Sequence, residues 1–128
     1  MHCWGLGAYG EVGTGTAAAD QRTPAQVMPV AMHVDAGQMG TCAVLPDGQA
    51  QCWGFNQTGG VGDGTTTDRS TPTTVVASLT FTSISASGDH SCARANTGQL
   101  FCWGNSSEGQ LGTGSGSGSA FVPQLVMP

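Results

Sequence analysis

The tripeptide Cys-Trp-Gly occurs three times in this 128-residue chain, at Cys3-Trp4-Gly5, Cys52-Trp53-Gly54 and Cys102-Trp103-Gly104. The copies lie 49 and 50 residues apart, and each is followed by the same spacing of glycines, Gly-x4-Gly-x2-Gly-x-Gly. A fixed period of this length indicates a repeat architecture, in which every unit packs on its neighbours. We therefore expect one domain over residues 1–128, with repeat units at approximately 3–51, 52–101 and 102–128, the last of them incomplete.

The residues that recur in every unit are interpreted as structural. The tryptophans keep a fixed place beside a cysteine, which suits packing between neighbouring units better than an exposed platform for sugars. The glycines keep their spacing while the residues between them vary, which is typical of a loop of defined shape. The structural positions are Trp4, Trp53, Trp103, Gly5, Gly54, Gly104, Gly13, Gly62 and Gly112.

The residues between these markers favour strands and turns over helices. The chain has 21 glycines and 6 prolines, which disfavour helix interiors and mark turns. Segments such as Val34-Asp35-Ala36 alternate apolar and polar side chains, as half-buried strands do. A proline follows each tryptophan by about 20 residues, and proline is tolerated in an edge strand because it lacks an N–H donor. We expect an all-β chain whose units each contain a strand, a glycine-rich loop, a proline-led edge strand and two further strands.

Two hairpins are predicted in detail. Pro46-Asp47-Gly48 and Asn96-Thr97-Gly98 each suit a three-residue turn that ends in a left-handed glycine. Opposed Cα atoms in such a hairpin lie about 4.5 Å apart at non-hydrogen-bonded positions, close enough for a disulfide. Centring the turns on their middle residues predicts two cross-strand disulfides, Cys42–Cys52 and Cys92–Cys102. The alternative is four small buried thiols in a reducing compartment.

Together these residues resemble the regulator of chromosome condensation repeat family, over essentially the whole chain. The segment from Cys52 to Thr65 and the hairpin from Gly88 to Gly104 carry the resemblance best. It implies a seven-bladed β-propeller of four-stranded blades, of which this chain would form about two and a half. The remaining blades of the parent propeller are then expected partners. The paired cysteines are more similar to the bacterial and secreted branch of the family than to the nuclear one.

Several kinds of chemistry are disfavoured by what the chain lacks. It has no lysine, three arginines and a net charge of −5, so we expect no nucleic-acid binding. Its cysteines and histidines are not clustered at the spacing of zinc sites, and residues 63–68 lack the closing glutamate of a calcium loop. His90 and Ser91 are neighbours on an expected strand and point to opposite faces, which does not suit a nucleophile and its base. We expect no catalytic residue, metal site or cofactor.

The leading functional hypothesis is a non-enzymatic scaffold that binds another protein. Repeat loops vary in sequence while the core recurs, and we expect loops of successive units to form one face for an unidentified protein partner. The candidate binding residues are Tyr9, Phe55, Asp68 and Arg69. Two alternatives are guanine-nucleotide exchange with chromatin association, which the family resemblance implies, and a glycan-binding adhesin domain that uses Tyr9 and Phe55.

The cysteines also bear on location. Paired cysteines favour an extracellular, periplasmic or cell-surface protein. No apolar stretch approaches the roughly 18 residues of a membrane span, and the N-terminus has no signal-peptide pattern. Asn56 and Asn105 satisfy the acceptor pattern for N-glycosylation. The fifth cysteine, Cys3, would find its partner about ten residues upstream, before the chain begins, so we expect a fragment of a larger propeller.

Overall fold

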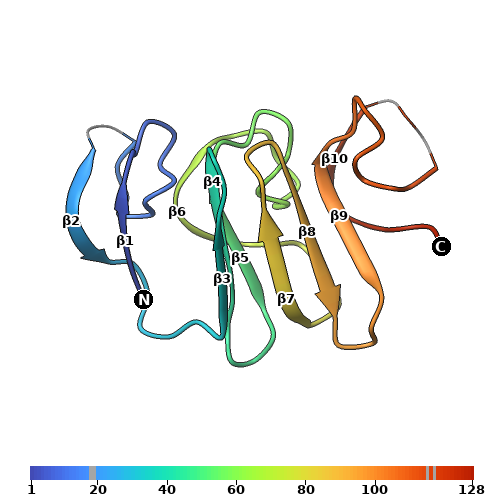
Figure 1. Cartoon of the computed structure of the whole chain (residues 1–128), viewed down its shortest axis with the longest axis horizontal. Helices are drawn as coiled ribbons and strands as arrows, with labels where there is room; N and C mark the ends of the chain where they lie inside the picture. The colour runs from blue at the N-terminus through green and yellow to red at the C-terminus, as the bar shows by residue number, and fades with distance from the viewer. Residues whose placement is uncertain (18–19, 115, 117) are drawn as a thin grey trace.

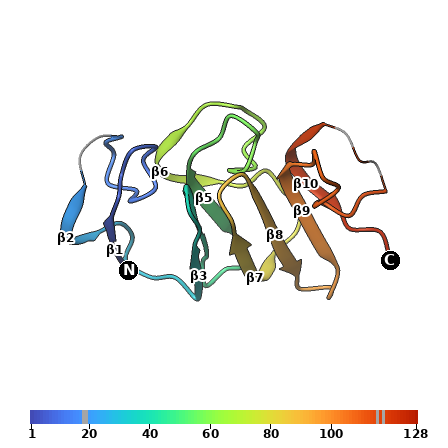
Figure 2. The same ribbon diagram turned by 45° about the horizontal axis from the view of Figure 1, so that its top comes forward.

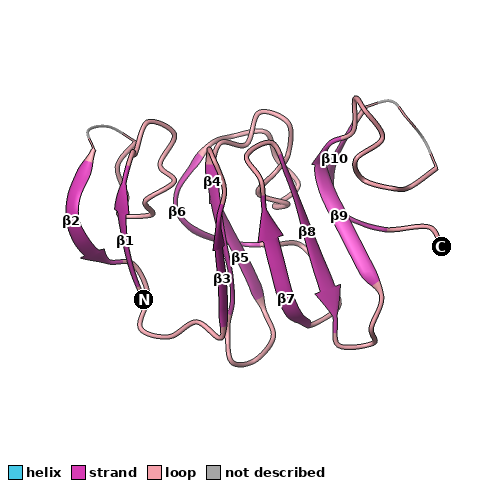
Figure 3. Cartoon of the chain, viewed as in Figure 1, coloured by secondary structure: helices cyan, strands magenta, loops and turns pink. Residues whose placement is uncertain are grey.

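The computed structural model describes residues 1–17, 20–114, 116 and 118–128. Within these residues the secondary structure consists of strands and turns, and no helix is present (Figure 3). This confirms the all-β prediction. The strands are β1 (His2–Gly5), β2 (Gln21–Gln26), β3 (His33–Ala36), β4 (Gly40–Val44), β5 (Ala50–Gly54), β6 (Arg69–Thr74), β7 (Phe81–Ala86), β8 (His90–Ala95), β9 (Leu100–Asn105) and β10 (Ser119–Leu125).

The strands form three antiparallel sheets that stand side by side in chain order (Figures 1 and 2). The first sheet has two strands, β1-β2, and the other two have four each, in the orders β3-β4-β5-β6 and β7-β8-β9-β10. Two complete four-stranded sheets and one half sheet agree with the predicted two and a half blades. Each sheet buries its faces against the next, so the core lies between sheets.

The sheets are out of phase with the repeat units of the sequence. The second sheet takes β3, β4 and the start of β5 from unit 3–51, and the rest of β5 and β6 from unit 52–101. The third sheet is divided between units 52–101 and 102–128 in the same way. Trp53 and Trp103 therefore each lie on the third strand of a four-stranded sheet, and the chain crosses from one unit to the next inside a hairpin.

Both predicted hairpins have the expected register. Cys42 pairs with Cys52 and Cys92 with Cys102, and the Cα atoms of each pair lie 4.1 Å apart. The sulfur atoms of each pair are at the disulfide distance of 2.11 Å. Gly48 has a φ of 84° and its counterpart in the other turn a φ of 90°, so both turns end in a left-handed glycine as the sequence predicts.

The three prolines that follow a tryptophan by about 20 residues lie in the last strand of each sheet, at its edge. Pro72 is in β6 and Pro123 in β10, and in both strands the ladder register shifts around the proline. Proline has no N–H to offer a ladder, so an edge strand with an irregular register accommodates it without an unsatisfied partner. The predicted edge position is confirmed.

The largest core cluster lies between the second and third sheets. Trp103 is fully buried there and packs near Phe81, with ring centroids 6.3 Å apart. Val44 and Ala50 come from the second sheet and Ile84 from the third. A chain with few large apolar residues thus obtains a core by placing one tryptophan at each contact between sheets, where an aromatic side chain removes the largest area from water.

Side chains also tie the first strand of the second sheet to the first strand of the third. The main-chain N–H of Ala86 donates to Asp35 Oδ2 at 2.8 Å, and the N–H of Ile84 donates to His33 Nδ1 at 3.4 Å. These N–H groups lie on the edge of β7 that has no neighbouring strand in its own sheet. The side chains of β3 therefore satisfy an edge that would otherwise be open.

In the part of the chain that the structure describes, no helix is long and apolar enough to cross a membrane.

Candidate functional site: a face built from repeated loops

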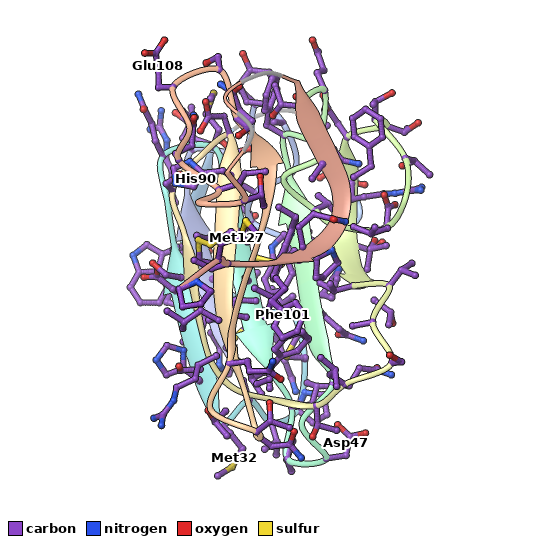
Figure 4. The ribbon with its side chains drawn as sticks, turned by 90° about the vertical axis from the view of Figure 1, so that its right-hand side faces the viewer. Met32, Asp47, His90, Phe101, Glu108 and Met127 are labelled. Carbon is purple, nitrogen blue, oxygen red and sulfur yellow. A yellow bond between two sulfur atoms is a disulfide. The ribbon has the colours of Figure 1, made fainter. Side chains whose placement is uncertain are left out.

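The long loops of all three sheets lie at one end of the molecule, which we call the loop face (Figures 1 and 2). It comprises the described residues of loops 6–20, 55–68 and 106–118 together with the short turns 37–39 and 87–89. Figure 4 shows His90 and Glu108 at this end and Met32 and Asp47 at the opposite end. Residues 18–19, 115 and 117, which belong to the predicted variable loops, lie outside the described residues.

One main-chain carbonyl in each of the first two loops joins that loop to the next sheet. The carbonyl of Glu11 accepts hydrogen bonds from Trp53 Nε1 and Thr41 Oγ1, both at 2.9 Å. One repeat later, the carbonyl of Gly60 accepts the same pair of bonds from Trp103 Nε1 and Ser91 Oγ, again at 2.9 Å. The predicted packing of Trp53 and Trp103 between neighbouring units is therefore observed, with a hydrogen bond that fixes each indole ring.

The glycines of these loops allow the close approach that the carbonyls need. A Cβ on Gly62 would lie 2.6 Å from Trp103 Nε1, and a Cβ on Gly13 would lie 2.6 Å from Trp53 Nε1. A side chain at either position would push the loop off the neighbouring sheet. Gly112, at the equivalent place in the third loop, faces no tryptophan within the described residues.

The glycines of the Cys-Trp-Gly tripeptides all have a positive φ at the end of their strand, between 102° and 119°. A Cβ on Gly54 or Gly104 would collide with the main chain of the turn before the neighbouring strand, at Met39 and Asp89 respectively. Gly5 has nothing within 4 Å of that position. Its strand has no neighbour on that side, because the first sheet contains only β1 and β2.

Trp4 departs from the expected packing. It is 64% exposed, whereas Trp53 and Trp103 are 1% and 0% exposed. Trp4 lies on β1 in the first sheet of the row, and within the described residues no other sheet precedes that sheet (Figure 1). The prediction that every tryptophan packs between units is thus wrong for Trp4, and the cause is the missing neighbour.

A fully buried asparagine organises the second loop. Asn56 Oδ1 accepts the main-chain N–H of Val61 at 2.9 Å, and Asn56 Nδ2 donates to the carbonyls of Thr65 and Thr67 at 3.1 and 2.9 Å. The main-chain N–H of Asn56 itself donates to Asp68 Oδ1 at 2.8 Å. Asn56 therefore closes loop 55–68 upon itself. With 0% exposure and an amide that donates inside the loop, Asn56 cannot carry a glycan in the folded chain, although it satisfies the acceptor pattern.

An ion pair supports the same loop from its outer side. Asp63 Oδ2 accepts a hydrogen bond from Arg69 Nε at 2.7 Å, and Arg69 Nη2 lies 2.6 Å from the same oxygen. Asp63 Oδ1 accepts the hydroxyl and the main-chain N–H of Thr65. Burial alone would raise the pKa of Asp63, but the bonds from Thr65 and Arg69 outweigh it and hold the pKa below its usual value. Two predicted binding residues, Asp68 and Arg69, thus shape the loop.

The other two predicted binding residues meet between the first and second loops. Tyr9 and Phe55 form an edge-to-face pair with ring centroids 5.3 Å apart. Both side chains are partly buried. Each ring covers part of the other, so the pair offers a compact apolar ridge rather than an open flat ring of the kind that stacks on a sugar.

A polar cluster connects the turn 87–89 to the third sheet. Asp89 accepts a hydrogen bond from Asn105 Nδ2 at 2.8 Å and lies 3.0 Å from His90 Nδ1. The bond from Asn105, followed by that from His90, lowers the pKa of Asp89 against the opposing effect of burial. The side chain of Asn105, which also satisfies the acceptor pattern, is therefore engaged with Asp89.

The cluster also contains Ser87, whose hydroxyl lies 2.9 Å from His90 Nδ1. A catalytic triad needs the acid on one ring nitrogen of the histidine and the nucleophile on the other. Here Ser87 and Asp89 contact the same nitrogen, so the arrangement orients the imidazole without activating a hydroxyl. Within the described residues, no three His, Cys, Asp or Glu side chains gather in a way that could hold a metal ion.

The repeat can now be placed among known proteins. The sequence profile described as "Regulator of chromosome condensation (RCC1) repeat" matches residues 47–94 and 97–128, and a second profile of the same description matches residues 81–110. These matches cover more than half of the chain. The chain belongs to the RCC1 repeat family.

Solved structures agree on the fold. Prp20p from Saccharomyces cerevisiae, described with its binding properties to Gsp1p and histones, is 23% identical over 98% of this chain, with a TM-score of 0.86. Yeast RCC1 (Prp20) bound to Kap60 gives 23% identity over 98% of the chain and a TM-score of 0.87. Human WBSCR16 gives 22% identity over 94% of the chain and a TM-score of 0.79.

This chain covers 33%, 32% and 33% of those three structures. It therefore has the fold of about a third of an RCC1-type β-propeller, as the repeat resemblance predicts. The three sheets correspond to consecutive blades.

Proposed function

We propose that this RCC1 repeat segment is a non-enzymatic scaffold that binds another protein through its loop face, outside the cytoplasm. The observation that carries the proposal is the way in which loops from separate blades are joined into one surface. A preorganised surface loses little conformational entropy on binding, which is the main requirement of a recognition face.

The joints between the loops are specific. Gly15 N–H donates to the carbonyl of Ser70 at 2.8 Å, and Gly64 N–H donates to the carbonyl of Phe121 at 2.9 Å, so each loop is bonded to the last strand of the next blade. Thr58 Oγ1 donates to the carbonyl of Asp89 at 2.8 Å, which joins the second loop to the turn of the third blade. These contacts use main-chain groups or small side chains, which leaves the exposed side chains free to vary.

The candidate contact residues are the Tyr9–Phe55 ridge and Arg69. Aromatic residues and arginine carry a large share of binding energy in protein interfaces. The ridge lies between two loops. Arg69 begins β6, directly after the second loop, and its side chain remains 34% exposed while it pairs with Asp63. The chain carries a net charge of −5, so a partner with a basic contact surface is favoured.

Affinity enrichment with a loop-face variant tests the proposal. The bait is the full chain with its disulfides intact, and the compared proteins are wild type, the double variant Tyr9→Ala/Phe55→Ala, and Asn96→Ala. Asn96 is exposed in the hairpin turn at the opposite end, so its variant is the matched control. We expect a partner that is enriched by wild type and Asn96→Ala and depleted about tenfold with the double variant. Equal enrichment by all three baits would contradict the loop face as the binding surface.

The compartment is tested separately. Two disulfides at adjacent strands are favoured in an oxidising compartment. In protein isolated from its natural source, with free thiols alkylated before lysis, Cys42, Cys52, Cys92 and Cys102 should take up label only after reduction. Labelling of these four cysteines before reduction would place the protein in a reducing compartment.

A further inference from the structure

The third loop of the loop face begins with the same backbone shape as the second. In the second loop the N–H of Gly59 donates to the carbonyl of Asn56 at 2.8 Å, and in the third the N–H of Gly109 donates to the carbonyl of Ser106 at 3.1 Å. The next turn repeats as well, with an N–H···O distance of 3.0 Å in both loops. The two loops therefore follow the same path up to the third glycine of the spacing.

The interior of the two loops differs. In the second loop the carboxamide of Asn56 fills it, since Nδ2 lies within 3.3 Å of four oxygen atoms of the loop and Oδ1 accepts the main-chain N–H of Val61. Ser106 stands at the same position of the third loop and has no carboxamide. The same backbone thus surrounds an amide in one loop and a short hydroxyl in the other.

The ion pair of the second loop has no counterpart in the third. Asp63 lies between the last two glycines of its loop, and Thr113 takes that position one repeat later. Arg69 pairs with Gly54 across the sheet, and the residue that pairs with the corresponding glycine of β9 is Ala120. Two groups that fill and support the second loop are therefore replaced by smaller ones in the third.

A cavity of about 420 Å³ lies at this place, between the third loop and β10. Ser106 is part of its wall and is 4% exposed, and its Oγ has no hydrogen-bond partner among the described residues. A buried hydroxyl without a partner is costly, so a ligand that supplies the partner gains from it. The other walls include Leu111, Thr113, Ser119 and Gln124.

The walls favour a neutral ligand that both donates and accepts hydrogen bonds. The residues that line the cavity all belong to the described part of the chain and include no ionisable side chain, so a charged group would stay unpaired inside. By correspondence with Val61, the main-chain N–H of Leu111 points into the cavity and offers a donor. A carboxamide combines a carbonyl acceptor with two N–H donors, and it is the group that the same backbone holds in the second loop.

We propose that this cavity is a binding pocket for a carboxamide group, and that its occupant is the side chain of a glutamine or asparagine of the protein that the loop face binds. The choice of occupant rests on the proposed function, because the third loop belongs to the loop face. The amide of the partner takes the position that Asn56 takes in the second loop and displaces water from the cavity.

Acetamide tests the pocket without any partner. The protein is the full chain, labelled with ¹⁵N and with its disulfides intact, and the main-chain amide of Leu111 reports on the cavity. Acetate and N,N-dimethylacetamide are the control probes, because both offer an acceptor of similar size but no N–H donor. The amide of Val61 is the internal reference, since Asn56 already occupies its acceptor site.

We expect the chemical shift of the Leu111 amide to saturate with a midpoint below about 100 mM acetamide, a weak affinity of the kind that a ligand of so few atoms can reach. The control probes should bind at least about tenfold more weakly. A shift that does not saturate, an equal response to all three probes, or an equal response of Val61 and Leu111 would overturn the pocket and show that the cavity holds water only.

Two variants of one residue locate the effect. Ser106→Asn supplies a carboxamide from the chain itself, so it should abolish the acetamide response and slow the deuterium exchange of the Leu111 amide. Ser106→Ala is the matched control, because it leaves the cavity open and should keep the midpoint within about threefold of wild type. A response that survives in Ser106→Asn would contradict the assigned position.

The occupant is tested with the same two variants as baits in the affinity enrichment. The partner should be depleted about tenfold with Ser106→Asn relative to Ser106→Ala, because the pocket is then filled. Equal enrichment by both baits, together with a saturating acetamide response, would overturn the occupant and leave the pocket. Failure of the Tyr9→Ala/Phe55→Ala test would overturn the proposed function and the occupant with it, whereas the acetamide result does not depend on that test.

Discussion

The buried amide of Asn56 permits a quantitative test of how the loop face is held. Replacing Asn56 by alanine removes the acceptor of the Val61 N–H and the donor to the carbonyls of Thr65 and Thr67. Each of these three bonds contributes about 1 kcal/mol net, and each partner left unsatisfied in the interior adds to the loss. We therefore expect Asn56→Ala to lower the free energy of unfolding by about 3 kcal/mol.

The third loop supplies the control. Ser106 occupies the position that corresponds to Asn56 and is 4% exposed, but its hydroxyl has no partner among the described residues. Ser106→Ala should therefore change the free energy of unfolding by less than about 0.5 kcal/mol.

Urea unfolding of the two variants and of wild type, followed by tryptophan fluorescence with disulfides intact, measures both differences. A loss below about 1 kcal/mol in Asn56→Ala, or equal losses in the two variants, would refute the reasoning. Hydrogen exchange of the Val61 amide gives a local reading of the same effect, since this amide should lose protection in Asn56→Ala and keep it in Ser106→Ala.

Three further predictions follow from matched positions. Asp63→Asn should reduce stability at neutral pH. Because the folded pKa of Asp63 lies below the ordinary 3.8, its contribution to stability is present above that value and is lost as the pH falls through the folded pKa. The urea midpoints of variant and wild type should therefore differ at neutral pH and converge as the pH falls below 3.8, and a constant difference would contradict this. Gly62→Ala should cost more than Gly98→Ala in urea unfolding, because both glycines have positive φ but only Gly62 also faces a tryptophan; equal losses would exclude the contact as the cause. Trp103→Ala should cost about 3–5 kcal/mol and the exposed Trp4→Ala less than about 1 kcal/mol by the same measurement, and similar losses would contradict the burial difference.

The register of the hairpins could be predicted from sequence because it depends on local geometry. A strand alternates its faces with a period of two, so the position of a short turn determines which residues oppose each other, and Cys42 meets Cys52 for that reason. The edge position of Pro72 can also be predicted from sequence, because proline has no main-chain N–H to donate to a neighbouring strand. The grouping of strands into sheets could not be read from the repeat, because a repeat can be divided at any point of its period.

The contacts of the loop face could be predicted only in part. Tyr9 and Phe55 stand out in the sequence as aromatic residues in polar loops, but their mutual contact depends on the spacing between two sheets, which no local pattern specifies. The carbonyl of Glu11 is the acceptor that anchors Trp53, and a main-chain atom leaves no trace in the sequence. Glu11 Oε1, which is buried without a hydrogen-bond partner among the described residues, is visible only in three dimensions, because the equivalent positions 60 and 110 carry Gly and Gln and show no recurring pattern.

Each four-stranded sheet takes its strands from two successive repeats. The loss or gain of one whole repeat therefore need not interrupt a sheet. Removing residues 52–101 in frame would join the strand that carries Cys42 to the one that carries Cys102, with the same ten-residue separation and the same turn. The product would contain one four-stranded sheet fewer, and no incomplete sheet would remain where residue 51 is joined to residue 102. The loss or gain of one period by unequal recombination therefore leaves the strand pairing at the junction unchanged, wherever in the period the break occurs.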